Sequence, residues 1–188
     1  IFLILLKMSL NLSTRRAPYR KKKSISPKEV EEYVEEQNII GYPSDISNID
    51  VSCARTYCAA ITADRNVVVW GKFVSELRLD KIPREANSVV QLATADDYMV
   101  ALKGDGTLVG WGVRDSLKTP SNLNNVSKVV AGKDNFLALL DNGTLVGWGG
   151  KRNFDVNKLP AKIYEDGSSI VDISMGYYHA VALKENGK

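Results

Sequence analysis

One motif recurs in register along residues 49–188, and this repetition constrains the fold more than any other feature. In the first three copies a tryptophan follows the second residue of an apolar pair by nine positions. The pairs are Ala60-Ile61, Ala101-Leu102, Ala138-Leu139 and Ala182-Leu183, and the tryptophans are Trp70, Trp111 and Trp148. Successive pairs are 41, 37 and 44 residues apart, a spacing typical of β-propeller blades. The pattern predicts an all-β repeat fold and excludes a helical solenoid.

Each copy is predicted to contain a β-hairpin, because a turn dipeptide lies between the pair and the tryptophan. Asp105-Gly106, Asn142-Gly143 and Asn186-Gly187 tolerate the positive φ angles of a type I′ turn, whereas Asp64-Arg65 is a weaker turn. Another β-rich run precedes each pair, at residues 49–52, 89–93, 129–131 and 170–174, and one proline precedes each run: Pro43, Pro83, Pro120 and Pro160. The repeats therefore span about 42–71, 82–112, 119–149 and 159–188, and the fourth ends before its tryptophan.

These features predict a partial β-propeller in which each tryptophan packs in the core between neighbouring blades. Residues 176–183 (Gly-Tyr-Tyr-His-Ala-Val-Ala-Leu) and 105–112 (Asp-Gly-Thr-Leu-Val-Gly-Trp-Gly) resemble the repeat of the regulator of chromosome condensation superfamily. The resemblance covers about residues 49–188. It implies a propeller that usually has seven blades, so a stack of four leaves an open edge and an apolar flank at each end. We expect further blades, from the same or another chain, or a larger assembly to cover them.

The repeats diverge from the family pattern. The family glycine is met by Gly132 and Gly176 and replaced by Ala54 and Ala95, and the family histidine is met only by His179. Tyr57, Tyr98 and Asn135 take the histidine position in the other copies. The resemblance implies a structural, hydrogen-bonding role for His179. The family's best-known activity, nucleotide exchange on a small GTPase at chromatin, is not carried over, because the loops differ.

A basic arm is expected at residues 1–25, with Met8 as the expected start of translation. Residues 1–28 carry eight Lys and Arg and no acid, which leaves 17 basic against 22 acidic residues, a formal charge of −5, for the remainder. The apolar run 1–6 is too short for a signal peptide or a membrane span. The six clustered cations, predicted to bind an anionic partner, are Arg15, Arg16, Arg20, Lys21, Lys22 and Lys23. That partner could be nucleic acid, an acidic protein groove or an import receptor. Two alternatives need no such partner: the segment is a solvated tail, or it is an organelle presequence.

Residues 26–38 are predicted to form an amphipathic helix that follows the arm. Ser26 and Glu29 form a capping box, and Pro27 occupies the first helical position. Val30 and Val34 share one apolar stripe with Tyr33. The helix is expected to dock either on a partner or on the edge of the propeller, which occupies residues 39–188.

The residues present do not predict an enzyme, a metal site or a cofactor site. His179 is the one histidine, and the spacing of Cys53 and Cys58 fits no common zinc signature. We expect the two cysteines to be structural thiols in a reducing compartment. The expected location is therefore intracellular, in the cytoplasm or nucleus, with a virion as an alternative and no membrane.

Function is expected to reside in the loops that link the copies, at residues 72–88, 113–125 and 150–168. Their charges are mixed, which favours a protein partner over a nucleic-acid groove. The candidate binding cations on these loops are Arg78, Arg84, Arg114, Lys118, Arg152 and Lys158. The favoured function is a non-enzymatic protein-interaction scaffold. Two alternatives remain: a structural component of a large assembly, such as a virus capsid or ribosome-like particle, and a chromatin or nucleic-acid adaptor.

Overall fold

A computed structural model of the chain describes residues 50–150, 160 and 163–188. These residues all belong to one compact unit, which spans residues 37–188. The predicted basic arm and the predicted helix at 26–38 lie outside the described residues. Residues 151–159 and 161–162 of the third linker also lie outside them.

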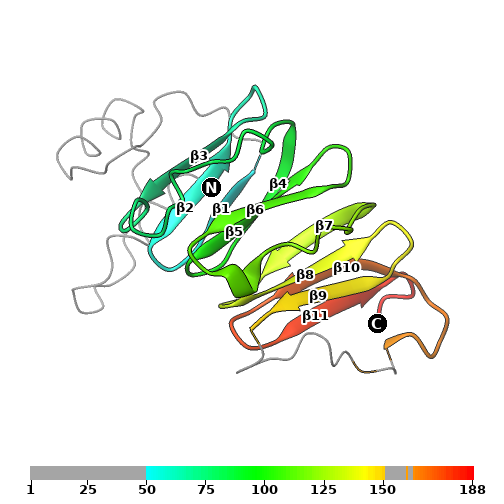
Figure 1. Cartoon of the computed structure of the whole chain (residues 1–188). Coiled ribbons are helices and arrows are strands. Elements are labelled where there is room, and N and C mark those ends of the chain that lie inside the picture. The colour runs from blue at the N-terminus through cyan, green and yellow to red at the C-terminus, as the bar shows by residue number, and fades with distance from the viewer. Residues whose placement is uncertain (1–49, 151–159, 161–162) are drawn as a thin grey trace, which may run out of the picture. The chain divides into compact units, whose positions relative to one another are not determined.

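The described residues form four antiparallel sheets, which we call blades 1 to 4 (Figure 1). Blades 1 to 3 have three strands each, in sequence order, and blade 4 has two. The strands are β1 (Val51–Cys53), β2 (Tyr57–Ile61), β3 (Val67–Gly71), β4 (Val89–Thr94), β5 (Tyr98–Lys103), β6 (Leu108–Gly112), β7 (Val126–Ala131), β8 (Asn135–Leu140), β9 (Leu145–Gly149), β10 (Ile170–Met175) and β11 (Ala180–Lys184). A short 3-10 helix, η1 (Asp115–Leu117), lies in the second linker. The predicted all-β architecture is confirmed.

Strand register repeats from blade to blade. In blades 2, 3 and 4 a β-bulge interrupts the first strand pair at the same place, next to Val89, Val126 and Ile170. The first strands also lie beside one another, since β4 contacts both β1 and β7, and β7 contacts β10. Equivalent residues of successive copies therefore occupy equivalent positions in space.

The hairpin turn between β5 and β6 differs from the predicted type I′ turn. The Lys103 N–H donates to the Thr107 carbonyl at 2.9 Å, so three residues lie between them, and the Gly106 N–H donates to the Lys103 carbonyl at 3.0 Å. Gly106 has a φ of +77°, and Asp105 does not have a positive φ, whereas a type I′ turn requires two such residues. The turn is thus a three-residue loop that ends in a left-handed residue.

The same turn follows β2, β8 and β11, the second strands of the other three blades. Gly143 and Gly187 have φ angles of +79° and +80°, and Arg65 takes the left-handed position in blade 1 with a φ of 65°. The preceding Asp or Asn has a separate role, because its side-chain oxygen accepts the N–H two residues later. This bond is 3.0 Å long from Thr107 to Asp105 and 3.0 Å from Thr144 to Asn142. The dipeptide was therefore a correct signal for a hairpin but not for its turn type.

The tryptophans of blades 2 and 3 lie in the core between blades, as predicted. Trp111 packs in a cluster built from blade 1, blade 2 and the first linker, and Trp148 packs in the next such cluster. Each indole N–H donates to a linker carbonyl: Trp111 to Leu79 at 2.9 Å, and Trp148 to Leu117 at 3.1 Å. The linkers thus complete the core instead of only connecting blades.

Polar side chains also join neighbouring blades. The buried Tyr57 hydroxyl, at the family's histidine position, donates to the Ala95 carbonyl of blade 2 at 2.8 Å. On the first strands, the Leu92 N–H donates to the Asp50 carboxylate at 2.9 Å. One blade further on, the Val129 N–H donates to Gln91 Oε1 at 2.9 Å. These bonds fix the register of each blade against the next.

Blade 4 presents an apolar flank. Val181 and Leu183 of β11 are 62% and 47% exposed. Their equivalents in blade 2, Val100 and Leu102, are covered by blade 3 and are 0% and 3% exposed. The expected apolar flank is therefore present. That further blades or a larger assembly cover it remains a prediction.

Candidate interaction surface

Four short turns, each between the first and second strand of a blade, surround one shallow depression of about 410 Å³. Every turn is closed by the same backbone hydrogen bond, such as Ala54 N–H to the Tyr57 carbonyl at 2.9 Å. The two residues at the tip differ in each copy: Arg55-Thr56, Asp96-Asp97, Lys133-Asp134 and Tyr177-Tyr178. The repeat thus brings four chemically different tips to one place.

The linkers begin beside these turns. Lys72 N–H donates to the Thr56 carbonyl at 2.9 Å, and Val113 N–H donates to the Asp97 carbonyl at 3.2 Å. Two exposed apolar side chains, Phe73 and Val113, are thereby added at the same end of the blades. We call the eight tip residues, together with Lys72, Phe73, Val113 and Arg114, the turn surface.

Ion pairs cross between blades on the turn surface. Arg114 binds Asp97 through Nη2 at 2.6 Å and lies 3.6 Å from Asp134 of blade 3. Arg55 Nε lies 3.7 Å from Asp96 of blade 2. The cations are the outer partners, since the Arg55 side chain is 74% exposed and that of Asp96 is 19% exposed. Each carboxylate is therefore largely enclosed, and each guanidinium extends to solvent.

Aromatic rings stand beside two cations of the turn surface. Lys133 Nζ lies 5.0 Å from the centre of the Tyr177 ring, and Lys72 Nζ lies 5.0 Å from that of Phe73. A hydrogen bond with the Tyr177 side chain raises the pKa of Lys133. Tyr177 and Tyr178 pack edge to face and are both exposed.

Cys53 and Cys58 form a disulfide, which corrects the prediction of two thiols. The two residues are directly opposite in the pairing of β1 with β2, with Cα atoms 4.1 Å apart. A two-residue turn makes a C-x4-C spacing a cross-strand pair, and this geometry was overlooked. Since disulfides persist in oxidising compartments, the expected intracellular location loses the support of the cysteines. No helix in the described part of the chain is long and apolar enough to cross a membrane.

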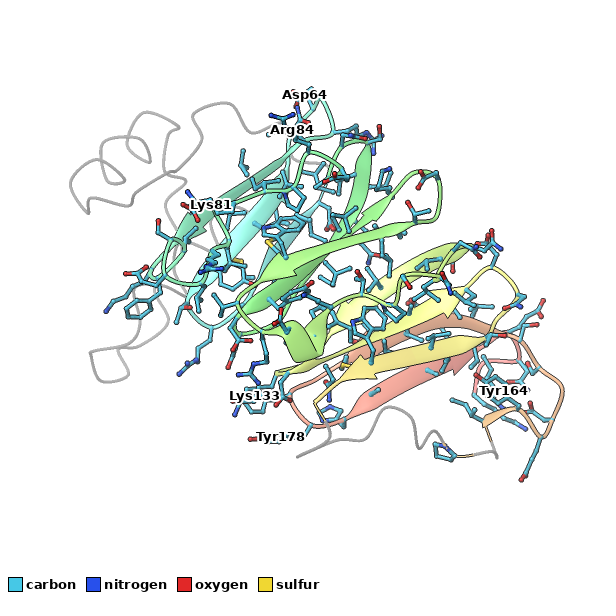
Figure 2. The ribbon with its side chains drawn as sticks, in the orientation of Figure 1. Asp64, Lys81, Arg84, Lys133, Tyr164 and Tyr178 are labelled. Atoms are coloured by element: carbon cyan, nitrogen blue, oxygen red, sulfur yellow. A yellow bond between two sulfur atoms is a disulfide. The ribbon has the colours of Figure 1, made fainter. Side chains whose placement is uncertain are left out.

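The six predicted loop cations do not gather in one place. Arg78, Arg84 and Lys118 are exposed along the linkers, and Lys118 pairs with Asp115 at 2.9 Å. In Figure 2, Arg84 and Asp64 lie toward the opposite end of the blades from Lys133 and Tyr178. Arg114 does reach the turn surface. The two remaining loop cations and the six arm cations lie outside the described residues: Arg152, Lys158, Arg15, Arg16, Arg20, Lys21, Lys22 and Lys23.

His179 was predicted to form structural hydrogen bonds. The structure places it directly before β11, exposed, with its ring packed so closely on Gly176 that a Cβ there would lie 2.5 Å from Cε1. No hydrogen bond of its side chain to another described residue is found. In blade 4 the glycine and histidine of the family pattern are therefore in direct contact, because the absence of a Cβ at Gly176 makes room for the His179 ring.

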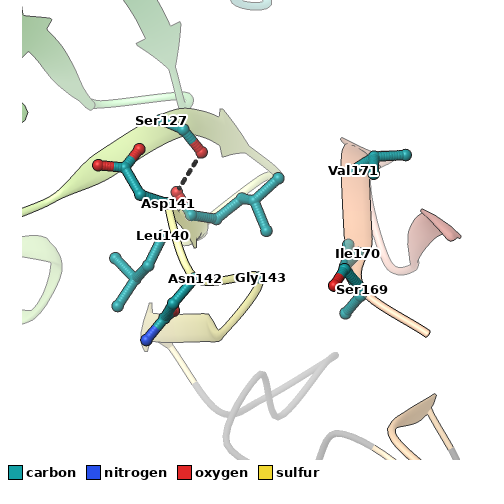
Figure 3. A pocket seen from close by; sticks show the side chains of 9 residues that line it. Ser127, Leu140, Asp141, Asn142, Gly143, Ser169, Ile170 and Val171 are labelled. Carbon is teal, nitrogen blue, oxygen red and sulfur yellow. Dashed lines mark hydrogen bonds between the residues drawn. The ribbon is translucent and has the colours of Figure 1, made fainter. Parts of the chain in front are cut away.

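A second depression of about 400 Å³ lies between blades 3 and 4, at the other end of the strands (Figure 3). The β8–β9 turn lines one side, and Ser169, Ile170 and Val171 line the other. Ser127 Oγ donates to the Leu139 carbonyl at 3.1 Å, and Asp141 is the one ionisable residue in the lining. Among residues 50–150 and 163–188, no group of three His, Cys, Asp or Glu side chains could hold a metal ion. This depression offers less chemistry than the turn surface.

The third blade matches a known family in sequence. Residues 126–154 match the Regulator of chromosome condensation (RCC1) repeat. Blade 3 is therefore similar to one repeat of this family. The chain has no match among curated protein sequences.

Solved structures share the fold of this chain at low sequence identity. The ectodomain of the Physcomitrella patens receptor kinase CR4 is 19% identical over 78% of this chain, with a TM-score of 0.62. Prp20p from Saccharomyces cerevisiae is 21% identical over 73%, with a TM-score of 0.55, and the Arabidopsis thaliana ACR4 ectodomain is 21% identical over 71%, with a TM-score of 0.53. The match spans 41%, 42% and 45% of these three proteins, respectively. The predicted propeller fold is confirmed.

Sequence analysis missed the turn tips. A signal for them was available in the register of the four repeats, because the two residues that follow Ala54, Ala95, Gly132 and Gly176 change character completely from copy to copy. Loop positions that vary while their neighbours are kept similar are not needed for the common fold and are free to serve binding.

Proposed function

We propose that this chain is a non-enzymatic protein-interaction scaffold that contacts its partner through the turn surface. The observation that carries the proposal is the convergence of four different turn tips on one shallow depression. A broad, open surface with exposed tyrosines and arginines has the composition of protein-binding hot spots. Repeat proteins build such composite surfaces from equivalent positions of successive repeats.

The similarity to Prp20p supports a protein partner. The structure of that yeast protein was described together with its binding to Gsp1p and histones. Its RCC1-type fold is thus compatible with protein recognition. The mixed charge of the turn surface agrees with the same class of partner, because nucleic acid favours a surface of uniform positive charge.

Two other functions were raised by the sequence: a structural component of a large assembly and a nucleic-acid adaptor. The adaptor depends on the basic cluster at residues 15–23, which lies outside the described residues. The assembly component rests on that cluster, on the predicted helix at 26–38 and on the exposed flank of blade 4. Titration with DNA and RNA at several salt concentrations tests the adaptor, because phosphate contacts make affinity fall steeply with salt.

Photo-crosslinking tests the scaffold proposal. A photoreactive amino acid replaces Tyr178 on the turn surface in one variant and Arg84 in the control, both exposed and at opposite ends of the blades (Figure 2). In cells that express the protein, we expect one defined polypeptide to be crosslinked from position 178 and not from position 84. Equal crosslinking from both positions, or none from position 178, would contradict the proposal.

A further inference from the structure

Cations lie outside and carboxylates inside on the turn surface, although the two are nearly equal in number. The cations are Arg55, Lys72, Arg114 and Lys133, and the acids are Asp96, Asp97 and Asp134. The side chains of Asp97 and Asp134 are 18% and 11% exposed, whereas that of Arg114, which pairs with both, is 42% exposed. An approaching partner therefore meets positive groups first.

Arg55 has donors available for a second carboxylate. Its 3.7 Å contact with Asp96 is longer than a hydrogen bond, and its guanidinium group carries five N–H donors. The flat guanidinium matches the two oxygens of a carboxylate in a bidentate arrangement. This residue lies at the rim of the depression, where Lys133 is the corresponding residue of blade 3.

Apolar groups are interspersed with these cations. Tyr177, Tyr178, Phe73 and Val113 are each between 45% and 51% exposed. Two of the rings lie directly beside lysines, so a partner that pairs with the lysine also contacts the ring. Burial of such rings contributes most of the binding energy at protein interfaces.

We propose that the turn surface binds an acidic protein segment in which single carboxylates alternate with aromatic or large aliphatic side chains. This inference rests on the proposed scaffold function and specifies its partner. The carboxylates pair with Arg55 and Lys133, and the apolar side chains pack on Tyr177 and Tyr178. A polyanion such as nucleic acid fits less well, because Asp96, Asp97 and Asp134 lie directly behind the cations and offset most of their charge.

Fluorescence anisotropy with defined peptides tests the inference on the full 188-residue chain. The probe is a labelled peptide in which Glu alternates with Phe and Leu. Its two counterparts replace Glu with Lys, or Phe and Leu with Ser. We expect the first peptide to bind at least about tenfold more tightly than either counterpart, since each lacks one of the two complementary features.

Matched charge reversals locate the binding. The double variant Arg55→Glu with Lys133→Glu should weaken binding of the acidic peptide by about tenfold or more. The control, Lys81→Glu with Arg84→Glu, makes the same change of charge on the first linker and should leave binding within about twofold of the wild type. Arg55→Glu places a second carboxylate beside Asp96, and Lys81→Glu places one beside Asp80. Thermal melts therefore establish that each double variant is folded at the temperature of the binding assay.

Four results would overturn the inference. They are stronger binding of the basic peptide, equal loss of binding in the control variant, displacement of the peptide by an oligonucleotide of equal charge, and binding of none of the peptides. A specific crosslink from position 178 would then show that the scaffold proposal survives with a partner of different chemistry.

Discussion

The indole N–H of Trp111 donates to the backbone carbonyl oxygen of Leu79, 2.9 Å away, across the boundary between blade 2 and the first linker. Both residues are buried. Trp148 and Leu117 form the same pair one blade later, at 3.1 Å. The first and second linkers therefore each contribute a buried leucine and a carbonyl acceptor to the next tryptophan, and the stability of neighbouring blades is coupled through these pairs.

Trp111→Ala is expected to lower the free energy of unfolding by about 3–5 kcal/mol, because it opens a cavity in the core between blades 1 and 2. Trp111→Phe should cost about 1–3 kcal/mol, since it keeps an aromatic ring but leaves the Leu79 carbonyl without its donor. Denaturant unfolding measures both. The control is Phe73→Ala on the exposed surface, with an expected change within about 0.5 kcal/mol. Equal effects of Phe73→Ala and Trp111→Ala would contradict the assigned burial.

Gly106→Val and Gly143→Val are each expected to destabilise the fold by about 1–3 kcal/mol. The two glycines hold φ angles of +77° and +79°, which a β-branched residue resists. Arg65→Gly provides an inverse control, because Arg65 already has a left-handed φ of 65° and glycine relieves the strain there. Thermal melts should show a loss for the two valine variants and no loss for Arg65→Gly. Unchanged melting of both valine variants would show that the left-handed turn is not required.

The sequence was sufficient to predict the repeats and not the contacts between them. Trp111 and Gly106 recur at fixed spacing, so periodicity located both the core and the hairpins. Leu79 lies in a linker without periodicity, and only packing shows that it belongs to the core. The prediction of a type I′ turn at Asp105-Gly106 was wrong because this dipeptide is compatible with both a two-residue and a three-residue loop. The register of β5 with β6 selects the three-residue loop.

The candidate site was hidden for a similar reason. The predicted binding residues Arg78 and Arg84 lie in the long linkers, whereas the residues that meet around the depression lie on the shortest turns. Arg55 and Tyr177 are far apart in sequence and share a surface only because the blades are stacked. The Cys53–Cys58 bridge likewise depends on strand register, which spacing alone does not reveal.

Reduction of the Cys53–Cys58 disulfide is expected to lower stability by about 2 kcal/mol, a low value because the bridge closes a short loop with a sequence separation of five. β1 pairs with β2 at three positions, fewer than in the other blades, so its attachment depends more on this bridge. Melts with and without dithiothreitol measure the effect. The double variant Cys53→Ser with Cys58→Ser should melt like the reduced wild type and ignore the reductant. A wild type that is insensitive to reductant would show that the bridge does not support the fold.

Asp166 is expected to make folding stability depend on pH in the acid range. A hydrogen bond from Lys184, 2.8 Å away, and further bonds from the Ser168 N–H and the Asn186 amide lower the pKa of Asp166 from 3.8 to about 2. Because the folded-state pKa is the lower one, the stabilisation is fully present above pH 3.8 and is lost as the pH falls towards 2. Asp166→Asn should therefore be less stable than the wild type at neutral pH, and the difference should shrink between pH 4 and pH 2. Urea unfolding over this range measures it, with Asp115→Asn as a control on an exposed carboxylate of the second linker. A difference between Asp166→Asn and wild type that stays constant down to pH 2 would show that the Lys184 pair does not anchor the third linker to β11.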